Sequence, residues 1–294
     1  MYFRPALALL LLALALPTAR AQGRASVAVL DMGAGPTASR AAERLAKLLA
    51  GGAPGLAVLD RGMSGAAARG VGYAGSLNMT LAEARALGSA VGCDFYLAGD
   101  AQTIRRSSSE RPVYFESYAS VFVVSARTGR LVAWDRPAAE AGSAEEAERS
   151  LLAALGPRAQ VYAAAIAEAA GSEERERFRA AEAEPASVID LSTDDGAGAN
   201  ADLREPAPYR RLRPAYTDAA ARAEAEATVD ASVEIGADGE VADVKVVRWA
   251  GYGLDEEVAA TVRRMHFRPA ERDGVRVAVR VLLRYNFRRP PKRQ

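Results

Sequence analysis

The sequence predicts an α+β protein, with an N-terminal layered α/β domain followed by a small antiparallel sheet packed on helices. Short apolar runs alternate with helical segments through the first half of the chain, which is typical of a sheet covered by helices. In the second half, "VRVAVRVLLRYNF" (275–287) has an apolar residue at every odd position, as expected for a strand with one buried face. Asp-Gly pairs between such runs predict hairpin turns.

The chain begins with a segment typical of a secretory signal peptide. Arg4 precedes an apolar run over 6–16, and Ala19-Arg20-Ala21 supplies the small residues that a signal peptidase recognises. We therefore expect residues 1–21 to be removed on export. A bilayer span needs about 20 apolar residues. The alternative is that the segment stays uncleaved as a membrane anchor, and the shortness of the apolar run disfavours it.

Charge and cysteine content set further limits. The chain has 38 basic and 37 acidic side chains, so its net charge of +1 identifies no partner. Its one cysteine, Cys93, cannot form an intrachain disulfide, and both domains must depend on their hydrophobic cores. The apolar neighbours of Cys93 indicate a small buried side chain.

Residues 22–180 are expected to form the first domain. The strands "SVAVLD" and "LAVLDR" flank a helix with an apolar side. A polar, glycine-rich stretch, the helical "TLAEARALGSAVG", the strand "DFYLAGDAQT" and a hairpin turning at Thr128-Gly129 follow in that order. Ser143 and Glu146 have capping-box spacing. They open a helix that we expect to pause at Gly156-Pro157, before a charged helical end.

Two further segments complete the chain. Residues 181–208 have the acidic, Gly-, Ala- and Pro-containing composition of a flexible linker. Residues 209–288 read as the second domain, with a strand over 228–235, the Asp238-Gly239 turn and the returning strand "EVADVKVVRW". A helix with Leu254, Val258 and Val262 on one face comes next, and the long strand 275–287 precedes a basic tail at 289–294.

The second domain resembles the TonB C-terminal domain family. The shared features are a strand, a "DG" turn, "VADVKVV", "GYGLDEE", a helix, "FRPA", a second "DG" and a final strand, over about eighty residues. Departures are Ala227 where the family tends to have glycine, Met265-His266 in place of an aromatic-containing pair, and Tyr216-Thr217 in place of Tyr-Pro. The resemblance implies a periplasmic domain that contacts outer-membrane transporters.

In such a domain a partner segment pairs with a sheet edge by β-augmentation. We expect the final strand to supply that edge. The predicted partner-binding residues are Val275, Arg276, Val277, Arg280, Arg284, Tyr285, Asn286 and Arg288. The row of arginines either flanks the edge, attracts acidic surface including the chain's own linker, or simply keeps an open sheet face hydrated.

Residues 25–135 resemble, more loosely, the CsgG and FlgO group of secretion-associated periplasmic domains. The residues that carry this resemblance are "VAVLD", "AVLDR", "ALGSAVGCDFYLAGDAQ" and "VVSARTGRLVAWD". Pore-forming members add lipidated cysteines and membrane-inserting hairpins, and the sequence shows neither. Pore formation is therefore not expected.

Motifs for catalysis or cofactor binding are weak. Gly33, Gly35 and Ala38 fit G-x-G-x-x-A, but Asp60 follows later than a dinucleotide site requires, and an ordinary helix start near Pro36 is the simpler interpretation. A single histidine, His266, cannot form a metal cluster, and no Ser-His-Asp or Cys/His arrangement can be assembled. We expect no cofactor, no metal and no enzymatic activity.

The sequence therefore predicts a periplasmic protein that binds a partner protein or peptide through its C-terminal sheet. The partner would be a TonB-dependent receptor or an envelope complex, in TonB-linked transport or as an adaptor to it. The alternative is a CsgG-like secretion or envelope-assembly accessory whose TonB-like unit is a docking module. Neither nucleic acid nor a small-molecule substrate is expected as a partner, and a homodimer is possible.

Overall fold

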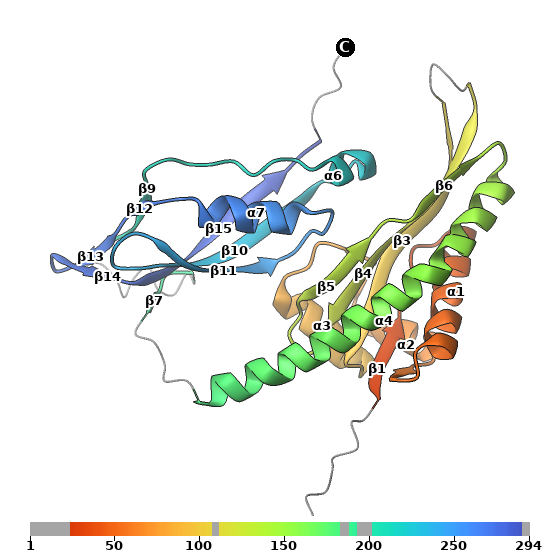
Figure 1. Cartoon of the computed structure of the whole chain (residues 1–294), viewed down its shortest axis with the longest axis horizontal. Coiled ribbons are helices and arrows are strands. Elements are labelled where there is room, and N and C mark those ends of the chain that lie inside the picture. Colours follow the sequence, from red (N-terminus) through yellow and green to blue (C-terminus); the bar gives the residue numbers. More distant parts are fainter. Residues whose placement is uncertain (1–23, 108–111, 183–187, 193–201, 290–294) are drawn as a thin grey trace, which may run out of the picture.

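The computed structural model describes residues 24–107, 112–182, 188–192 and 202–289, which form two domains side by side (Figure 1). The signal segment lies outside the described residues. The N-terminal domain is a mixed sheet covered by helices, and the C-terminal domain is a curled, mainly antiparallel sheet with one principal helix. The expected α+β class is confirmed.

The N-terminal sheet has the order β2-β1-β3-β4-β5, and β6 also pairs with β4. The strands β1, β2 and β3 are parallel, whereas β3, β4, β5 and β6 are joined by antiparallel pairing. The strand bounds are β1 Ala25–Val29, β2 Leu56–Val58, β3 Phe95–Arg106, β4 Tyr114–Ser125, β5 Leu131–Asp135 and β6 Ala138–Ala141.

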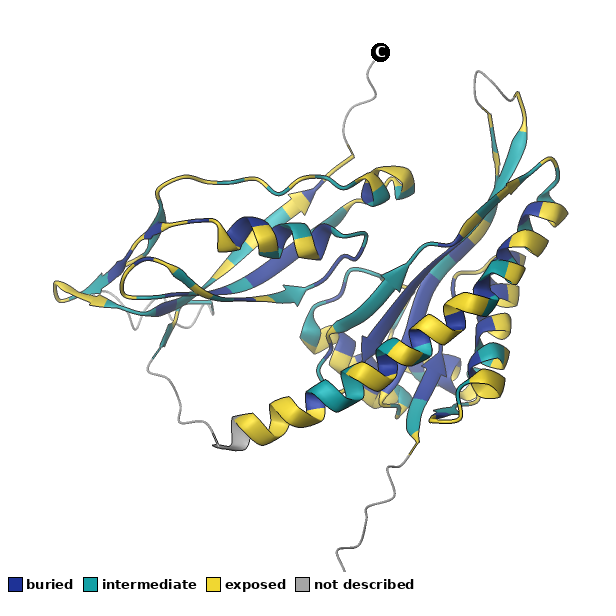
Figure 2. Cartoon of the chain, viewed as in Figure 1, coloured by how far each residue is buried: buried dark blue, intermediate teal, exposed yellow. Residues whose placement is uncertain are grey.

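Helices cover both faces of this sheet. The helices α1 (Pro36–Gly52) and α4 (Ala144–Glu182) bury one face around Val29, Leu97 and Val121. The helices α2 (Arg61–Gly70) and α3 (Leu81–Val91) cover part of the other face. Figure 2 shows the buried residues concentrated in the central strands and on the inward side of α4.

One expectation for these helices was wrong. The α4 helix does not pause at Pro157 but continues through it to Glu182. Pro157 and Ala153 are both exposed, so water can hydrate the Ala153 carbonyl that loses its helical N–H donor, while Leu151, Leu155 and Ile166 anchor the helix on the sheet. The polar, glycine-rich stretch after β2 begins with α2.

The glycine motif is a helix start, as the simpler interpretation held. Pro36 is the first residue of α1, with Gly35 as its N-cap. The Asp60 side chain accepts a hydrogen bond from the N–H of Met63 at 2.8 Å and thereby caps α2. The carboxylate that a dinucleotide ribose would need is therefore already used within the fold.

The C-terminal sheet has the order β11-β10-β15-β7. The strand β10 (Ala227–Ile235) lies antiparallel between β11 (Val241–Arg248) and β15 (Val279–Phe287), and α7 (Leu254–Arg263) packs on one face. The short helix α6 is Asp218–Ala223. The Asp-Gly turn expected at 273–274 is present, with positive φ at both residues, as a type I′ hairpin requires.

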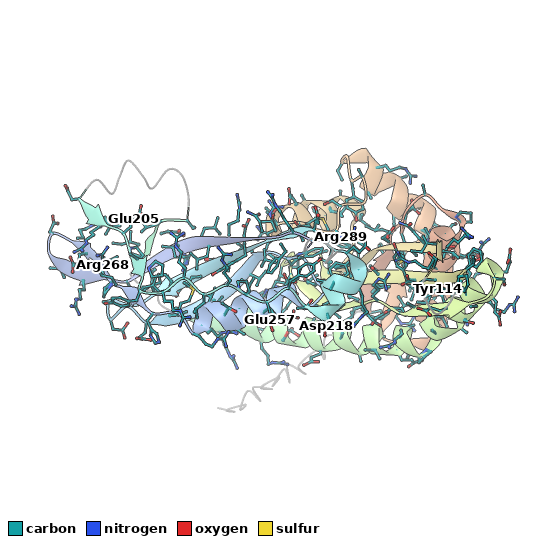
Figure 3. The ribbon with its side chains drawn as sticks, turned by 90° about the horizontal axis from the view of Figure 1, so that it is seen from above. Tyr114, Glu205, Asp218, Glu257, Arg268 and Arg289 are labelled. Atoms are coloured by element: carbon teal, nitrogen blue, oxygen red, sulfur yellow. The ribbon has the colours of Figure 1, made fainter. Side chains whose placement is uncertain are left out.

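Short strands surround this sheet. Three of them, β7 (Ile189–Asp190), β8 (Leu203–Arg204) and β9 (Ala207–Pro208), lie within the range that we expected to be a flexible linker. They pair with β15, β13 (Ala270–Arg272) and β12 (Phe267–Arg268) respectively. Figure 3 shows Glu205 and Arg268 at the end of the molecule far from Tyr114. The described parts of this range therefore run along the outer end of the C-terminal domain.

The two domains share a buried contact around Trp249. Its side chain is 1% exposed, lies in the same core as Phe122 of β4, and donates from Nε1 to the Gly129 carbonyl at 3.0 Å. A Cβ at Gly251 would stand 2.4 Å from the Phe122 ring, so only glycine permits this approach. The C-terminal domain thus completes the core that α2 and α3 leave partly uncovered.

Hydrogen bonds from the Asn78 side chain and from the backbone extend the same contact. Asn78 donates to the carbonyls of Thr228 and Trp249 at 2.8 and 2.7 Å and accepts from the Thr228 N–H at 3.0 Å. The Trp249 N–H donates to the Met79 carbonyl at 3.2 Å. The start of β10 and the end of β11 are therefore fixed to the N-terminal domain.

Replacing Trp249 with alanine should lower the free energy of unfolding by about 3–5 kcal/mol, because the change opens a cavity and leaves the Gly129 carbonyl without its donor. Trp249→Phe keeps most of the packing and should lose less. Urea denaturation of the two variants measures both effects. Equal, negligible losses would show that the domains do not hold this contact in solution.

Candidate functional site

The strand β15 divides its side chains between two faces. Odd-numbered residues belong to the core beneath α7, namely Val279, Val281, Leu283, Tyr285 and Phe287. Arg280, Leu282, Arg284 and Asn286 alternate with them and point to the opposite face, since successive strand residues face opposite sides. The periodicity seen in the sequence is therefore that of a half-buried strand, as expected.

The backbone N–H and C=O groups of successive β15 residues also alternate in direction, toward β10 and away from it, in the plane of the sheet. Ile189 and Leu191 donate their N–H groups to the carbonyls of Ala278 and Arg280, at 3.1 and 2.8 Å, on the side of the strand away from β10. In an antiparallel pair, alternate residues direct both backbone groups outward. The outward groups further along are therefore those of Leu282, Arg284 and Asn286.

The outward groups beyond Arg280 have no backbone partner among the described residues. In that part of the chain, β15 pairs only with β10 and with β7, and the β7 pairing covers only Val279 and Arg280. From Val281 to Phe287, the outward N–H and C=O groups are therefore not paired with any other described strand. Such an edge is a template for another strand.

Arginines on the open face of β15 form ion pairs with β10. Arg284 contacts both oxygens of Asp230, at 2.7 and 3.0 Å, and Arg248 of β11 reaches the same carboxylate at 3.2 Å. Burial alone would raise the pKa of Asp230, but the hydrogen bonds from the two arginines outweigh it and hold the pKa below its usual value. Arg280 pairs in the same way with Glu234, at 2.5 Å.

These pairs decide what the arginine row contributes. Each guanidinium of β15 lies over the sheet and is held by an acidic side chain of a neighbouring strand. The arginines of the open face are therefore already paired within the sheet. Arg280 differs from Arg284 because it also contacts Asp190 of β7, at 3.2 Å.

The structure separates the predicted site residues. Val275, Arg276 and Val277 form β14, which pairs with β13 in a different sheet. The expectation of one continuous strand over 275–287 was therefore wrong: pairing partners change at Ala278, between β14 and β15. The alternation alone cannot reveal such a change.

The other predicted residues lie on or beside β15. Tyr285 points into the core, with its hydroxyl 3.7 Å from the Met265 sulfur, and Asn286 accepts a hydrogen bond from the Thr228 hydroxyl at 2.8 Å. Arg288 follows the last strand residue and is exposed. Sequence reasoning missed Leu282, which is 39% exposed at the open edge, and the β7 residues Ile189 and Asp190.

A groove between the domains is a second feature of interest. It has a volume of about 1020 Å³ and lies between β5, β11 and α7, and its lining residues include Trp134, Val246, Ala259, Arg85 and Arg263. Asp255 also lines it. Burial raises the pKa of Asp255 to about 6, although its carboxylate accepts hydrogen bonds from the N–H groups of Ala250 and Gly251.

Among the residues that the structure describes, no group of His, Cys, Asp and Glu could hold a metal ion. In the same part of the chain, no helix combines the length and apolarity needed to cross a bilayer. His266 is exposed and contacts Glu240 at 2.9 Å.

Comparison with known proteins identifies the C-terminal domain. Residues 213–288 match the family model described as Gram-negative bacterial TonB protein C-terminal. The chain therefore carries a TonB C-terminal domain over these residues, about where the sequence features placed it. No curated protein is similar enough in sequence to count as a match.

Three solved structures show distant similarity. The TonB C-terminal domain of Pseudomonas aeruginosa is 23% identical, with 37% of this chain and 100% of that chain covered and a TM-score of 0.27. A hypothetical protein of Chlamydia trachomatis is 10% identical, covering 47% and 98%, with a TM-score of 0.32. A PelC dodecamer from Paraburkholderia phytofirmans is 15% identical, covering 47% and 90%, with a TM-score of 0.27.

Removing the Asp230 carboxylate should destabilise the C-terminal sheet. Asp230→Ala leaves Arg248 and Arg284 without their shared acceptor and should cost about 1.5–3 kcal/mol, as measured by urea denaturation. Glu234→Ala removes a carboxylate that is 25% exposed, against 4% for Asp230, and should cost less than about 1 kcal/mol. Since the pKa of Asp230 is lowered, its contribution is full above the ordinary value and is lost as pH falls through the lowered one. Equal losses in the two variants would contradict this ranking.

The raised pKa of Asp255 predicts the opposite pH dependence. Folding disfavours its ionised form, so the stability that this group contributes should fall as pH rises from its ordinary pKa of 3.8 to about 6. Asp255→Asn removes the titration and should flatten that part of the profile. Thermal unfolding between about pH 4 and 7 compares the two chains. An unchanged slope in the variant would show that Asp255 does not titrate in this range.

Proposed function

We propose that this chain is a periplasmic protein that binds an extended segment of a partner protein along the outer edge of β15, in TonB-linked outer-membrane transport or as an adaptor to it. The observation that supports this most directly is the row of unpaired backbone groups at Leu282, Arg284 and Asn286. The match to the TonB C-terminal family model, which covers residues 213–288 and so includes β15, supports this proposal.

The chemistry of the edge suits backbone recognition. A partner strand would exchange N–H···O=C bonds with the outward residues and thereby extend the sheet. Its side chains would meet the core side of β15 on one face and the arginine-rich open face on the other. The partner we propose is a TonB-dependent outer-membrane receptor or another envelope protein with an accessible extended segment.

The contact between the domains fixes the position of this edge relative to the N-terminal domain. The N-terminal domain holds the start of β10 and the end of β11, on the side of the sheet opposite the open edge of β15. A partner can therefore approach β15 without displacing the N-terminal domain. We propose that the N-terminal domain orients the docking edge and transmits force from that edge to the rest of the envelope assembly.

A proline at an outward position tests the proposal. Leu282→Pro removes an outward N–H while the inward N–H groups of Val281 and Leu283 still pair with β10, so the sheet should stay folded. Leu282→Ala shortens the same side chain but keeps the N–H. A photo-crosslinker at Asn286, in cells that carry each chain, should capture an envelope protein with wild type and Leu282→Ala and lose it with Leu282→Pro.

Two results would contradict the proposal. One is equal capture by Leu282→Pro and Leu282→Ala, which would mean that the outward backbone takes no part in binding. The other is the absence of any captured protein with wild type. Circular dichroism and thermal unfolding that match between Leu282→Pro and wild type are the control that the variant is folded.

A further inference from the structure

The outer edge of β15 already holds a short segment of this chain. The strand β7 runs parallel to β15, with Ile189 opposite Val279 and Asp190 opposite Arg280. We infer that β7 is an internal occupant of the docking edge, which a partner segment must displace to pair along the whole strand. This inference rests on the proposed function, because it concerns the regulation of that same edge and the partner that fits it.

The backbone contacts of β7 are those of a docked strand. Its two flanking N–H donors, Ile189 and Leu191, bond to the carbonyls of Ala278 and Arg280. A partner that continued in register would next reach the outward groups of Leu282. The strand ends instead, because Ser192 turns back and donates from its N–H and hydroxyl to the Asp190 carboxylate, at 2.9 and 2.5 Å. The described residues of β7 therefore fill only the first part of the edge.

Side chains fix the direction and the chemistry of this segment. Ile189 and Leu191 pack against the C-terminal core on one face. Asp190, between them, faces Arg280 at 3.2 Å on the other face. The hydrogen bonds from Ser192 lower the pKa of Asp190 most, and Arg280 lowers it further. The edge therefore accepts an extended segment with an apolar residue on each side of a carboxylate.

The contact is suited to exchange. Asp190 and Arg280 are 42% and 35% exposed, and a surface pair of this kind contributes about 0–1 kcal/mol. Arg280 also keeps Glu234 as a partner when Asp190 leaves. By contrast, a longer strand gains the unpaired groups of Leu282, Arg284 and Asn286 as well. A longer partner therefore replaces β7 with a net gain of hydrogen bonds, whereas a short one must compete with a tethered segment.

The covalent link between β7 and its edge makes β7 an effective competitor despite its size. A segment that belongs to the same chain as its binding site acts at an effective concentration of about the millimolar range. A free peptide of the same sequence therefore has to compete with it. If the edge is open for only about a tenth of the time, the apparent affinity of the peptide falls about tenfold.

Binding of a free copy of the segment tests this inference on the full chain. The probe is a synthetic peptide of residues 187–193 with blocked ends, SVIDLST. The test variant Ile189→Pro/Leu191→Pro removes both N–H donors of β7. Its matched control, Ala197→Pro/Ala199→Pro, places two prolines at the same spacing in the same connecting stretch. Titrations followed by the backbone amide signals of Arg280 and Leu282, the outward residues opposite and next to β7, give the dissociation constants.

We expect the Ile189→Pro/Leu191→Pro chain to bind the peptide about tenfold more tightly than wild type and the matched control. A second pair of variants separates the effect of charge from the effect of the backbone hydrogen bonds. Asp190→Arg should also tighten peptide binding, because the new side chain repels Arg280. Asp202→Arg, at an exposed position, should not change peptide binding.

Equal affinity in all chains would overturn the inference while showing that the edge accepts strands, so the proposed function would stand. No binding to any chain would also overturn it, because the segment would then have no affinity for the edge. In that case the capture from Asn286 still decides the proposed function.

Discussion

The organisation of this protein depends on the two-fold alternation of β15. Side chains at odd positions enter the core beneath α7, and the same residues form the backbone bonds to β10. Even positions send their side chains to the open face and their backbone groups to the outer edge. One strand can therefore anchor the core and still offer hydrogen bonds to a partner, because the two tasks use different residues.

Charge and the domain contact support that arrangement. The carboxylates of Asp230 and Glu234 hold the arginines of β15 flat over the sheet, which keeps a hydrated face beside the edge and opposes unwanted association through it. On the far side of the sheet, Trp249 and Asn78 fasten β10 and β11 to the N-terminal domain. The edge that faces away from this contact is the one that we propose for docking and the one that β7 partly occupies.

Local signals explain which parts of the fold could be predicted from sequence. The strands β10 and β11, the helix α7 and both Asp-Gly turns follow from period-two patterns, helix-face spacing and positive-φ turn residues. The missed features depend on contacts between distant residues. The break at Ala278 arises from two different pairing partners, and Trp249 sits in the core of the other domain. The run "SVIDLS", apolar on either side of an acid within a polar stretch, was the available signal for β7.

Amide hydrogen exchange along β15 tests the account most directly. In the full-length chain, the N–H groups of Val281, Leu283 and Tyr285 should exchange slowly because they bond to β10, and those of Leu282, Arg284 and Asn286 should exchange fast because they face outward without a partner. Fast and slow exchange in strict alternation would support an open docking edge. Uniform protection of all six amides would show that the edge is already filled and would contradict the account.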